Sequence, residues 1–369
     1  MSFTRTDKSH MRRALELSHR GEGHVEPNPM VGCVIADEAR IVGEGWHKRF
    51  GGPHAEVVAL QAASQHAAQS TMYVTLEPCC HQGKTPPCSG QIVAAGIARV
   101  VIARQDPYPE VQGRGIEQLR AAGLQVELGL LSEEASEVVA PYEKLMHTGH
   151  PWITAKWAMT LDGRIASRTG SSQWISGESS RRVVHALRGR ADAILVGRRT
   201  VQQDDPLLTA RPPGPRIATR IVLDSHASLA LNSQLVRTID SAAVCVAVGP
   251  AAPETRCKLL EAAGCEILRL DGDTHADRFS RLLDELGRRR MTNLLVEGGG
   301  RLLGTLLDQD LIDEVHVFVA PKLIGGESSP SPILGTGIET IDLARQIDQP
   351  VVERCGEDVY IRGRTQRKN

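Results

Sequence analysis

The sequence predicts an α/β protein built from two different domains, and three observations support this prediction. The chain has 369 residues, a length at which polypeptides usually divide into domains that each bury a core. Short apolar runs typical of strands alternate with amphipathic stretches typical of helices. The pattern starts again after Pro151, yet no repeat of about 20 to 50 residues relates the two halves. We therefore expect a three-layer α/β sandwich with a largely parallel part, followed by an α/β domain of a different fold.

The first domain is expected to open with a helix and then to alternate strands with helices. Met11, Ala14, Leu15 and Leu17 lie on one stripe of a helix over residues 7–20. The later expected strands lie within 25–36 and over 41–46, 72–76 and 100–103, and the expected helices begin near 54 and at 88.

The boundary between the domains is expected just before the second pattern begins. The first domain should close near Leu128, and a helical stretch over 132–146 with the turn H-T-G-H-P at 147–151 would form the linker. These limits give one domain over 1–146 and another over 150–369.

The second domain is expected to open with a strand, W-I-T-A-K-W-A-M, from Trp152. Near its end, the run N-L-L-V-E-G-G-G-R-L-L-G-T-L-L predicts a strand to Glu297, a glycine turn and a helix from about Arg301. The other expected elements are a helix ending at 188 and strands at 193–196, 217–223, 351–355 and 358–362.

Composition argues against a polyanionic or membrane partner. Lys plus Arg number 43 against 44 Asp plus Glu, so no overall positive field attracts nucleic acid. Only 3% of residues are aromatic, which leaves few platforms for stacking bases. The sequence has neither an apolar signal region nor a run of about 18 apolar residues. The eight cysteines are therefore expected to be reduced in a cytoplasmic protein.

One histidine and two cysteines in the first half have the character of metal ligands. They are His54 in P-H-A-E and Cys79 and Cys88 at the two ends of C-C-H-Q-G-K-T-P-P-C. Three such ligands suit one Zn²⁺ per chain and leave the fourth tetrahedral position for a water, whose pKa the metal lowers to about 7. We assign all three residues to the metal.

Glu56 follows His54 by two positions, the H-x-E spacing of zinc nucleobase deaminases. In those enzymes the glutamate does not bind the metal but moves protons between the water and the departing amine. The alternative is a structural zinc site, with Cys80 or His81 as the fourth ligand. A closed site of that kind would leave Glu56 without a role.

The loop E-P-C-C-H-Q-G-K-T-P-P-C departs from the usual P-C-x-x-C and resembles the deaminase half of the bifunctional riboflavin-biosynthesis enzymes. The resemblance implies a cytidine-deaminase-like sandwich, with Asn28 of N-P-M-V-G against the pyrimidine and His47 as a substrate contact. Without it, Asn28 is a turn residue and His47 a surface histidine. Tyr108 stands where the family usually has asparagine, which leaves its role open, as it does that of Cys80.

The glycine run at 298–300 suits phosphate binding, because glycine allows close backbone approach and the amides at a helix start donate to phosphate. The turn over 197–200 is expected to meet a phosphate at a helix start as well. The glycine run is not the Rossmann fingerprint, because its spacing is G-x-G-x-x-x-G and no preceding βαβ unit has an acidic residue placed for a ribose.

The motifs A-K-W-A-M-T-L-D-G-R, S-S-Q-W-I-S-G, V-E-G-G-G and V-A-P-K-L-I-G-G resemble, in order, the reductase half of the same family. The resemblance implies a dihydrofolate-reductase-like α/β domain that uses NADPH. It implies cofactor contacts at Ala158, Trp174, Thr200, Asp204, Ser225, Gly299, Gly300, Arg301, Leu302, Leu303, Gly304 and Thr305, and substrate contacts at Ser172, Arg188, Leu208, Arg211 and Glu297.

Arg188 and Arg211 suit a ribose 5-phosphate because a guanidinium binds phosphate through paired hydrogen bonds. Without the resemblance they are equally well explained as solvated surface arginines. Lys156 and Glu297 are both candidates for the proton donor in the reduction.

The resemblance implies two successive steps on small phosphoribosylated pyrimidines: zinc-dependent deamination and then NADPH reduction of the ribose to a ribityl chain. Two alternatives remain open, a nucleoside or tRNA-type base deaminase fused to an unrelated domain, and a non-catalytic nucleotide-binding module with a structural zinc. The sequence does not fix the oligomeric state and allows a homo-oligomer.

Overall fold

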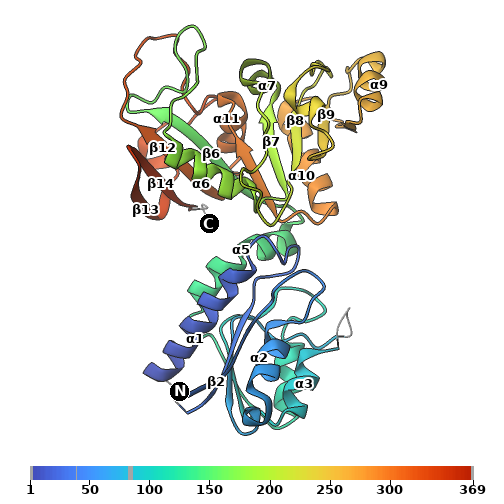
Figure 1. The fold of residues 1–369 in the computed structure, drawn as a ribbon, viewed down its shortest axis with the longest axis vertical. Coiled ribbons are helices and arrows are strands. Elements are labelled where there is room, and N and C mark those ends of the chain that lie inside the picture. The colour runs from blue at the N-terminus through green and yellow to red at the C-terminus, as the bar shows by residue number, and fades with distance from the viewer. Residues whose placement is uncertain (1–2, 39, 82–85, 367–369) are drawn as a thin grey trace. The chain divides into compact units, whose positions relative to one another are not determined.

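A computed structural model describes residues 3–38, 40–81 and 86–366 of the chain. The chain forms two compact units, Met1–Gly149 and His150–Asn369 (Figure 1). Each unit has its own sheet and its own apolar core. The prediction of two different α/β folds is confirmed.

The first unit contains a five-stranded sheet in the order β2-β1-β3-β4-β5. β1 is antiparallel to β2 and β3, whereas β3, β4 and β5 are parallel. The parallel pairing of β3, β4 and β5 is the largely parallel part that the sequence predicts for the sandwich. The strands are β1 Gly32–Asp37, β2 Arg40–Trp46, β3 Thr71–Val74, β4 Arg99–Ile102 and β5 Gln125–Leu128.

Helices cover both faces of this sheet, which gives the three layers (Figure 1). Cys33 and Ile35 of β1 face the core beneath one set of helices, while Val34 and Ala36 face the other set, as the two-residue period of a strand requires. The first set is α2 Ala55–Ala63, α3 Cys88–Ala94 and α4 Arg114–Ala121, and the second is α1 Arg5–Ser18 and α5 Ser132–Thr148.

The helix expected to act as a linker is part of the first unit. Ala135, Val138 and Val139 of α5 are buried against the apolar stripe of α1. An amphipathic helix with a buried face contributes to a core, whereas a linker helix would expose all of its faces. The change of unit therefore comes after Gly149.

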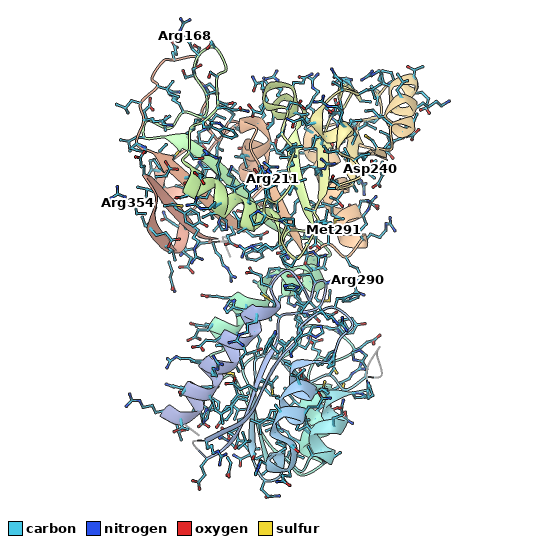
Figure 2. All side chains as sticks on the ribbon, viewed as in Figure 1. Arg168, Arg211, Asp240, Arg290, Met291 and Arg354 are labelled. Atoms are coloured by element: carbon cyan, nitrogen blue, oxygen red, sulfur yellow. The ribbon has the colours of Figure 1, made fainter. Side chains whose placement is uncertain are left out.

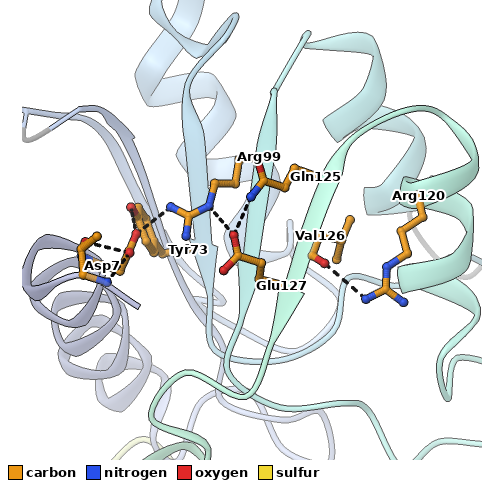
Figure 3. Close-up of polar contacts among 8 residues, drawn as sticks. Asp7, Tyr73, Arg99, Arg120, Gln125, Val126 and Glu127 are labelled. Carbon is orange, nitrogen blue, oxygen red and sulfur yellow. Dashed lines mark hydrogen bonds and ion pairs between the residues drawn. The ribbon is translucent and has the colours of Figure 1, made fainter. Parts of the chain in front are cut away.

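A polar network ties α1 to three strands (Figure 3). Asp7 caps the start of α1 with Thr4 and also accepts hydrogen bonds from Arg99 of β4 (2.6 Å) and the Tyr73 hydroxyl of β3 (2.8 Å). Arg99 in turn donates to Glu127 of β5 (2.9 Å). Burial alone would raise the pKa of Asp7, but these hydrogen bonds outweigh it and hold the pKa below its usual range.

The second unit contains a nine-stranded sheet in the order β10-β9-β8-β7-β11-β6-β12-β14-β13. All neighbours from β10 to β12 are parallel, and β14 and β13 add an antiparallel hairpin. The strands are β6 Trp152–Thr160, β7 Ala193–Gly197, β8 Thr219–Leu223, β9 Val244–Val248, β10 Glu266–Arg269, β11 Asn293–Glu297, β12 Glu314–Ala320, β13 Ile347–Cys355 and β14 Asp358–Thr365.

Two cores lie on the two faces of this sheet. Phe279 and Leu303 belong to one, and Leu187 and Leu260 to the other. Because the strands from β10 to β12 are parallel, their carboxyl ends meet at one edge, where open α/β sheets bind ligands. The helices are α6 Glu178–Arg188, α7 Arg198–Asp204, α8 Gln234–Arg237, α9 Glu254–Ala262, α10 His275–Arg288 and α11 Gly300–Asp308.

None of the helices in the described parts of the chain is long and apolar enough to cross a bilayer.

Candidate active sites

His54, Cys79 and Cys88 come together in the first unit. His54 is the N-cap of α2, Cys88 is the first residue of α3, and Cys79 lies in the loop after β3. Nδ1 of His54 lies 3.5 Å from Sγ of Cys79 and 3.2 Å from Sγ of Cys88, and the three ligand atoms all lie within 4.8 Å of one another. Hydrogen bonds from Cys88 and then from His54 lower the pKa of the Cys79 thiol, which favours the thiolate that binds metal.

Two thiols and an imidazole nitrogen at this separation fit a tetrahedral Zn²⁺. Neither alternative fourth ligand joins the group in the described part of the chain. Sγ of Cys80 instead lies 3.7 Å from the carbonyl oxygen of Glu110, and the His81 ring lies beside Tyr108, with centroids 5.8 Å apart. The donor set is therefore that of an open site rather than a closed structural one. Residues 82–85 of the predicted loop lie outside the described residues.

Glu56 lies in the first turn of α2, two residues from the His54 ligand, and only 3% of its surface is exposed. Burial raises the pKa of its carboxyl above the usual value. A carboxyl group in this position keeps its proton to a higher pH than an exposed glutamate does, and it can pass that proton to a group bound at the His-Cys-Cys site.

His47 is buried beside the cluster, with 3% of its surface exposed, so it is not the surface histidine that the residues alone suggested. Nδ1 donates to the carbonyl oxygen of Pro53 (3.0 Å), which leaves Nε2 to accept from Nδ2 of Asn28 (3.2 Å). Burial lowers the pKa of His47, so the ring is neutral. Its ring meets that of His54 edge-on, with centroids 5.4 Å apart. The hydrogen bond between Asn28 and His47 therefore fixes the orientation of both side chains beside the His-Cys-Cys group.

Glu77 is a structural part of this site that the sequence reasoning missed. Its buried carboxylate accepts backbone N–H bonds from Asp106 (3.3 Å), Gly113 (2.9 Å) and Ile116 (3.1 Å). The sequence did offer a signal for this role, because Glu77 directly precedes the Pro-Cys pair of the metal-ligand loop. Through these bonds Glu77 fixes the loop that carries Tyr108, whose ring lies against that of His81.

The second unit contains a cleft of about 980 Å³ at the carboxyl ends of β6, β7, β8, β9 and β11. All but one of the residues predicted for the cofactor line it, as do the five predicted for the substrate of the reductase half. They are Ala158, Trp174, Thr200, Asp204, Ser225, Gly299, Gly300, Arg301, Leu302, Leu303 and Thr305, with Ser172, Arg188, Leu208, Arg211 and Glu297.

Gly304 is the exception. It does not line the cleft but packs against the loop at Leu334, where an added Cβ would lie 1.5 Å from the carbonyl oxygen. Its role is therefore to allow close packing of α11. Gly298 and Gly299, by contrast, have φ angles of +75° and +88°, and a Cβ at Gly298 would meet open space. This turn at the start of α11 can receive a phosphate on backbone N–H groups.

A compact charge cluster lies at the end of β11. Glu297 accepts two hydrogen bonds from Arg188, at Nε (2.5 Å) and Nη2 (2.9 Å), and Nζ of Lys156 lies 3.7 Å from its carboxylate. Lys156 and Glu297 are direct neighbours in the pairing of β6 with β11. Burial would raise the pKa of Glu297, but the charges of Arg188 and Lys156 lower it to about 2. Burial lowers the pKa of Lys156.

The two arginines that were predicted to bind phosphate have different hydrogen-bond partners. Arg188 is not a solvated surface residue, and its guanidinium is not available to bind an anion in place of Glu297. Two of its nitrogens donate to the Glu297 carboxylate, and Nη1 donates to the carbonyl oxygen of Thr209 (3.3 Å). Arg211, labelled in Figure 2, is exposed and donates to the Thr209 hydroxyl (2.8 Å). His185 of α6, which the sequence analysis did not single out, also contacts the Thr209 carbonyl (Nδ1, 3.2 Å) and lines the cleft.

Two further predicted residues line the cleft from the segment that follows β6. The Ser172 hydroxyl donates to Asp204 (2.6 Å), which fixes the loop after β6 to the end of α7. The Trp174 ring is 65% exposed and carries the guanidinium of Arg181 at 4.8 Å from its centroid. An exposed aromatic ring at a cleft mouth is a suitable surface for a flat ligand.

Two families of known proteins match the chain, one in each of its two structural units. Residues 4–104 match the cytidine and deoxycytidylate deaminase zinc-binding region, and residues 151–361 match the RibD C-terminal domain.

Comparison with individual proteins extends over almost the whole chain. The riboflavin biosynthesis protein RibD of Aquifex aeolicus is 40% identical over 356 residues, which cover 96% of this chain and 97% of that protein. RibD of Escherichia coli K12 is 40% identical, covering 96% and 98%. The structure of Acinetobacter baumannii RibD superposes with a TM-score of 0.85 at 33% identity, covering 98% of this chain and 99% of the other. A diaminohydroxyphosphoribosylaminopyrimidine deaminase/5-amino-6-(5-phosphoribosylamino)uracil reductase from Thermotoga maritima gives 0.83 at 32%, with the same coverage.

Proposed function

The chain belongs to the RibD family of riboflavin biosynthesis proteins, and we propose how its two units share the work of a bifunctional deaminase and reductase. The first unit deaminates 2,5-diamino-6-(5-phosphoribosylamino)pyrimidin-4-one. The second reduces the ribosyl group of the product, 5-amino-6-(5-phosphoribosylamino)uracil, to a ribityl chain. The observation that carries this assignment is that one chain holds both an open His-Cys-Cys group beside a buried Glu56 and a cleft with a Lys-Glu-Arg cluster.

In the deaminase unit, His54, Cys79 and Cys88 would hold one Zn²⁺. Bound there, zinc lowers the pKa of a water in its open position and so makes a nucleophile available near neutral pH. Glu56 takes a proton from the attacking water and delivers one to the departing amine. Its raised pKa suits both transfers, because the group must hold the proton between them.

Asn28 and His47 orient the pyrimidine beside Glu56. The bond from His47 to Pro53 fixes the ring tautomer, and the bond from Asn28 to Nε2 fixes the direction of the amide. The remaining donor and acceptor of Asn28 are then presented in one orientation, which suits the edge of a heterocycle.

In the reductase unit, the glycine turn at Gly298 and Gly299 and the volume of the cleft fit a dinucleotide. NADPH supplies the hydride that reduces C1 of the ribose. The protein provides a proton for the ring oxygen and excludes water. Glu297 cannot give that proton near neutral pH, because its pKa is about 2. The other candidate is the ammonium of Lys156, whose pKa burial lowers, so that it gives up its proton more readily than an exposed lysine does. Lys156 is therefore the donor, and Glu297, fixed by Arg188, positions it.

Arg211 binds the 5-phosphate of the ribose, since its guanidinium is not paired with a carboxylate in the described structure. Leu208 and Ser172 also line the cleft.

The test is to incubate the protein with the diaminopyrimidinone phosphate, with and without NADPH, and to follow ammonia and the ribityl product separately. Ammonia should appear in both reactions and the ribityl product only with NADPH. Ammonia without any NADPH oxidation would favour a base deaminase fused to an unrelated domain. Absence of ammonia would favour a non-catalytic module with a structural zinc.

A further inference from the structure

One face of α6 forms part of the wall of the reductase cleft. Arg181, His185 and Arg188 recur at intervals of three or four residues, which places them on one face of the helix, and all three line the cleft. Arg181 lies over the ring of Trp174, and Arg188 donates to the carboxylate of Glu297. His185 lies between these two arginines along the helix, so its ring belongs to the same wall.

Thr209, in the segment between α7 and β8, is the common partner of three basic side chains. Its carbonyl oxygen lies 3.2 Å from Nδ1 of His185 and 3.3 Å from Nη1 of Arg188, and its hydroxyl accepts from Nη1 of Arg211 (2.8 Å). A carbonyl oxygen can only accept, so Nδ1 of His185 carries a proton. Nε2 has no hydrogen-bond partner in the described structure and is available to a ligand in the cleft.

The charges around His185 favour an anion. Arg188, Arg211 and Lys156 carry positive charges, and Glu297 carries the one negative charge of this group. Glu297 is already bonded to Arg188 and lies near Lys156, which leaves the charge of Arg211 without a carboxylate. An anion that binds to Arg211 would therefore lie in a positive field, close to the ring that is anchored on the same threonine.

Two further carboxylates line the cleft, those of Asp204 and Asp205, and both have other partners. Asp204 accepts from the Ser172 hydroxyl (2.6 Å), and Asp205 accepts from the backbone N–H of Gln234 (2.7 Å). Neither carboxylate is bonded to His185 in the described structure, so neither takes the place of an anion there.

The protonation of His185 depends on these neighbours. Burial and then the charges of Arg188 and Arg211 lower its pKa, and the bond to Thr209 and the charge of Glu297 oppose that shift only in part. The ring is therefore neutral at neutral pH while the cleft holds no anion. A phosphate dianion beside Nε2 would act in the opposite direction, because a nearby negative charge favours the imidazolium.

We propose that His185 is a further substrate-binding residue of the reductase site, which donates from Nε2 to the 5-phosphate next to Arg211 and takes up a proton from solvent when that phosphate binds. The inference rests on the proposed reductase function and on the assignment of the phosphate to Arg211. It adds a second phosphate ligand and makes the affinity for the substrate dependent on pH.

Proton uptake tests the inference in the wild-type protein, without any variant. The probe is ribose 5-phosphate, and calorimetry at about pH 7.5 in buffers of different ionisation enthalpy gives the protons taken up per molecule bound. A phosphate monoester has its second pKa near about 6, so in a cationic site it can only release its remaining proton. Net uptake therefore belongs to the protein. Wild type should take up a fraction of a proton with ribose 5-phosphate, and ribose should cause no uptake.

His185→Asn identifies the group that takes up the proton. The asparagine amide can replace Nδ1 as the donor to Thr209, so it preserves the anchor but cannot titrate. Proton uptake should disappear in this variant, a change that the loss of a merely structural bond would not cause.

The pH dependence of inhibition gives a second readout. Ribose 5-phosphate should inhibit NADPH oxidation in competition with the deaminated intermediate. For wild type the inhibition constant should rise by about tenfold between about pH 6.5 and 8.5, because the bond from a charged donor is lost as the pH rises through the pKa of His185 in the complex. For His185→Asn it should change far less over the same range.

His147→Asn is the matched control, because His147 is an exposed histidine of α5 in the first unit and does not line the cleft. It should behave as wild type does. The inference is overturned if wild type binds ribose 5-phosphate without proton uptake, or if His185→Asn retains both the uptake and the pH dependence; the assignment of Arg211 then stands. If wild type does not bind ribose 5-phosphate, the phosphate site at Arg211 fails together with the inference. Failure of the reductase function is a different result, the absence of NADPH oxidation.

Discussion

Among single residues, two buried glutamates have opposite surroundings and therefore opposite roles. Glu56 has no arginine or lysine partner in the described structure, and burial raises its pKa. Glu297 is also buried, but Arg188 and Lys156 lower its pKa to about 2. Surroundings that move two carboxyl groups in opposite directions separate a proton carrier from a permanent anion. Glu56 is therefore the carboxyl group that can take up and release a proton, whereas Glu297 remains a carboxylate that holds Lys156.

Replacing Glu56 by glutamine tests the first of these roles. Glu56→Gln should retain zinc, because all three ligands remain, and should lose deamination by at least about 10² to 10⁴. Zinc content and ammonia release measure the two effects independently. Glu44→Gln is the control, because Glu44 pairs with Arg13 away from the metal group. Retention of more than half of the wild-type rate in Glu56→Gln would exclude Glu56 as the proton carrier.

A pair of cysteine variants tests which thiol binds the metal. Cys79 belongs to the His-Cys-Cys group, while the thiol of its neighbour Cys80 faces the carbonyl of Glu110. Zinc content should therefore fall sharply in Cys79→Ser and stay near one per chain in Cys80→Ser. The opposite result would move the ligand by one residue. Loss in both variants would indicate a closed site that lacks the open position for water.

How well a residue's role could be predicted depends on how local its partners are. His54 and Glu56 share one helix start, so their H-x-E spacing was informative. Arg188 and Glu297 are 109 positions apart, and no local pattern shows that the guanidinium is already paired. Arg188 was therefore expected to bind phosphate. Gly304 was expected to contact the cofactor because sequence cannot show which side of α11 packs against Leu334.

At the scale of helices and strands, local sequence patterns predicted where many elements lie along the chain. They did not predict which elements pack or pair with one another in the fold. The expected strand ending at Glu297 and helices starting at residues 54–56 and at Cys88 are present as predicted. The insertion of β11 between β7 and β6 is a long-range pairing that no periodicity encodes. For the same reason α5 was taken for a linker, since its apolar face becomes meaningful only beside α1.

The Asp7 network shows how one side chain fixes an element, and its variant tests this. Asp7→Asn should destabilise the first unit by about 1 to 3 kcal/mol, because hydrogen bonds from Arg99 and Tyr73 to a charged acceptor are lost. Urea unfolding followed by circular dichroism measures the change. Asp37→Asn is the control, because Asp37 is exposed at the end of β1. A difference below about 0.5 kcal/mol would contradict the role of the network.

The same network predicts the direction of the pH dependence. The pKa of Asp7 is lower in the folded protein than in the unfolded chain, so the unfolded chain takes up a proton first as the pH falls. The stabilisation is fully present above the unfolded value of about 4 and is lost as the pH falls from there toward the folded value. Wild type and Asp7→Asn should thus converge in stability below about pH 4. A difference that remained constant down to pH 2 would contradict this account.

At the scale of the whole molecule, each apolar core of the described residues belongs to one unit. Among these residues, two core clusters lie within the first unit and three within the second. A unit that buries its own core can fold alone, provided that its sheet is complete. In the described part of the chain, strands β1 to β5 form one sheet and strands β6 to β14 the other, so each sheet is made by one unit.

Separate cores and separate sites lead to a prediction about fragments. A fragment over 150–369 should unfold cooperatively and oxidise NADPH with the deaminated intermediate in the absence of zinc. Every cleft residue named above lies within it, and so do all partners of Glu297. A fragment over 1–149 should bind one zinc and release ammonia from the diaminopyrimidinone phosphate, because His54, Glu56 and both ligand cysteines lie in it. Calorimetry establishes folding, and the two assays establish activity. A fragment over 150–369 that is folded yet inactive would mean that the reductase site needs residues of the first unit, and the two reactions could then not be assigned to separate units.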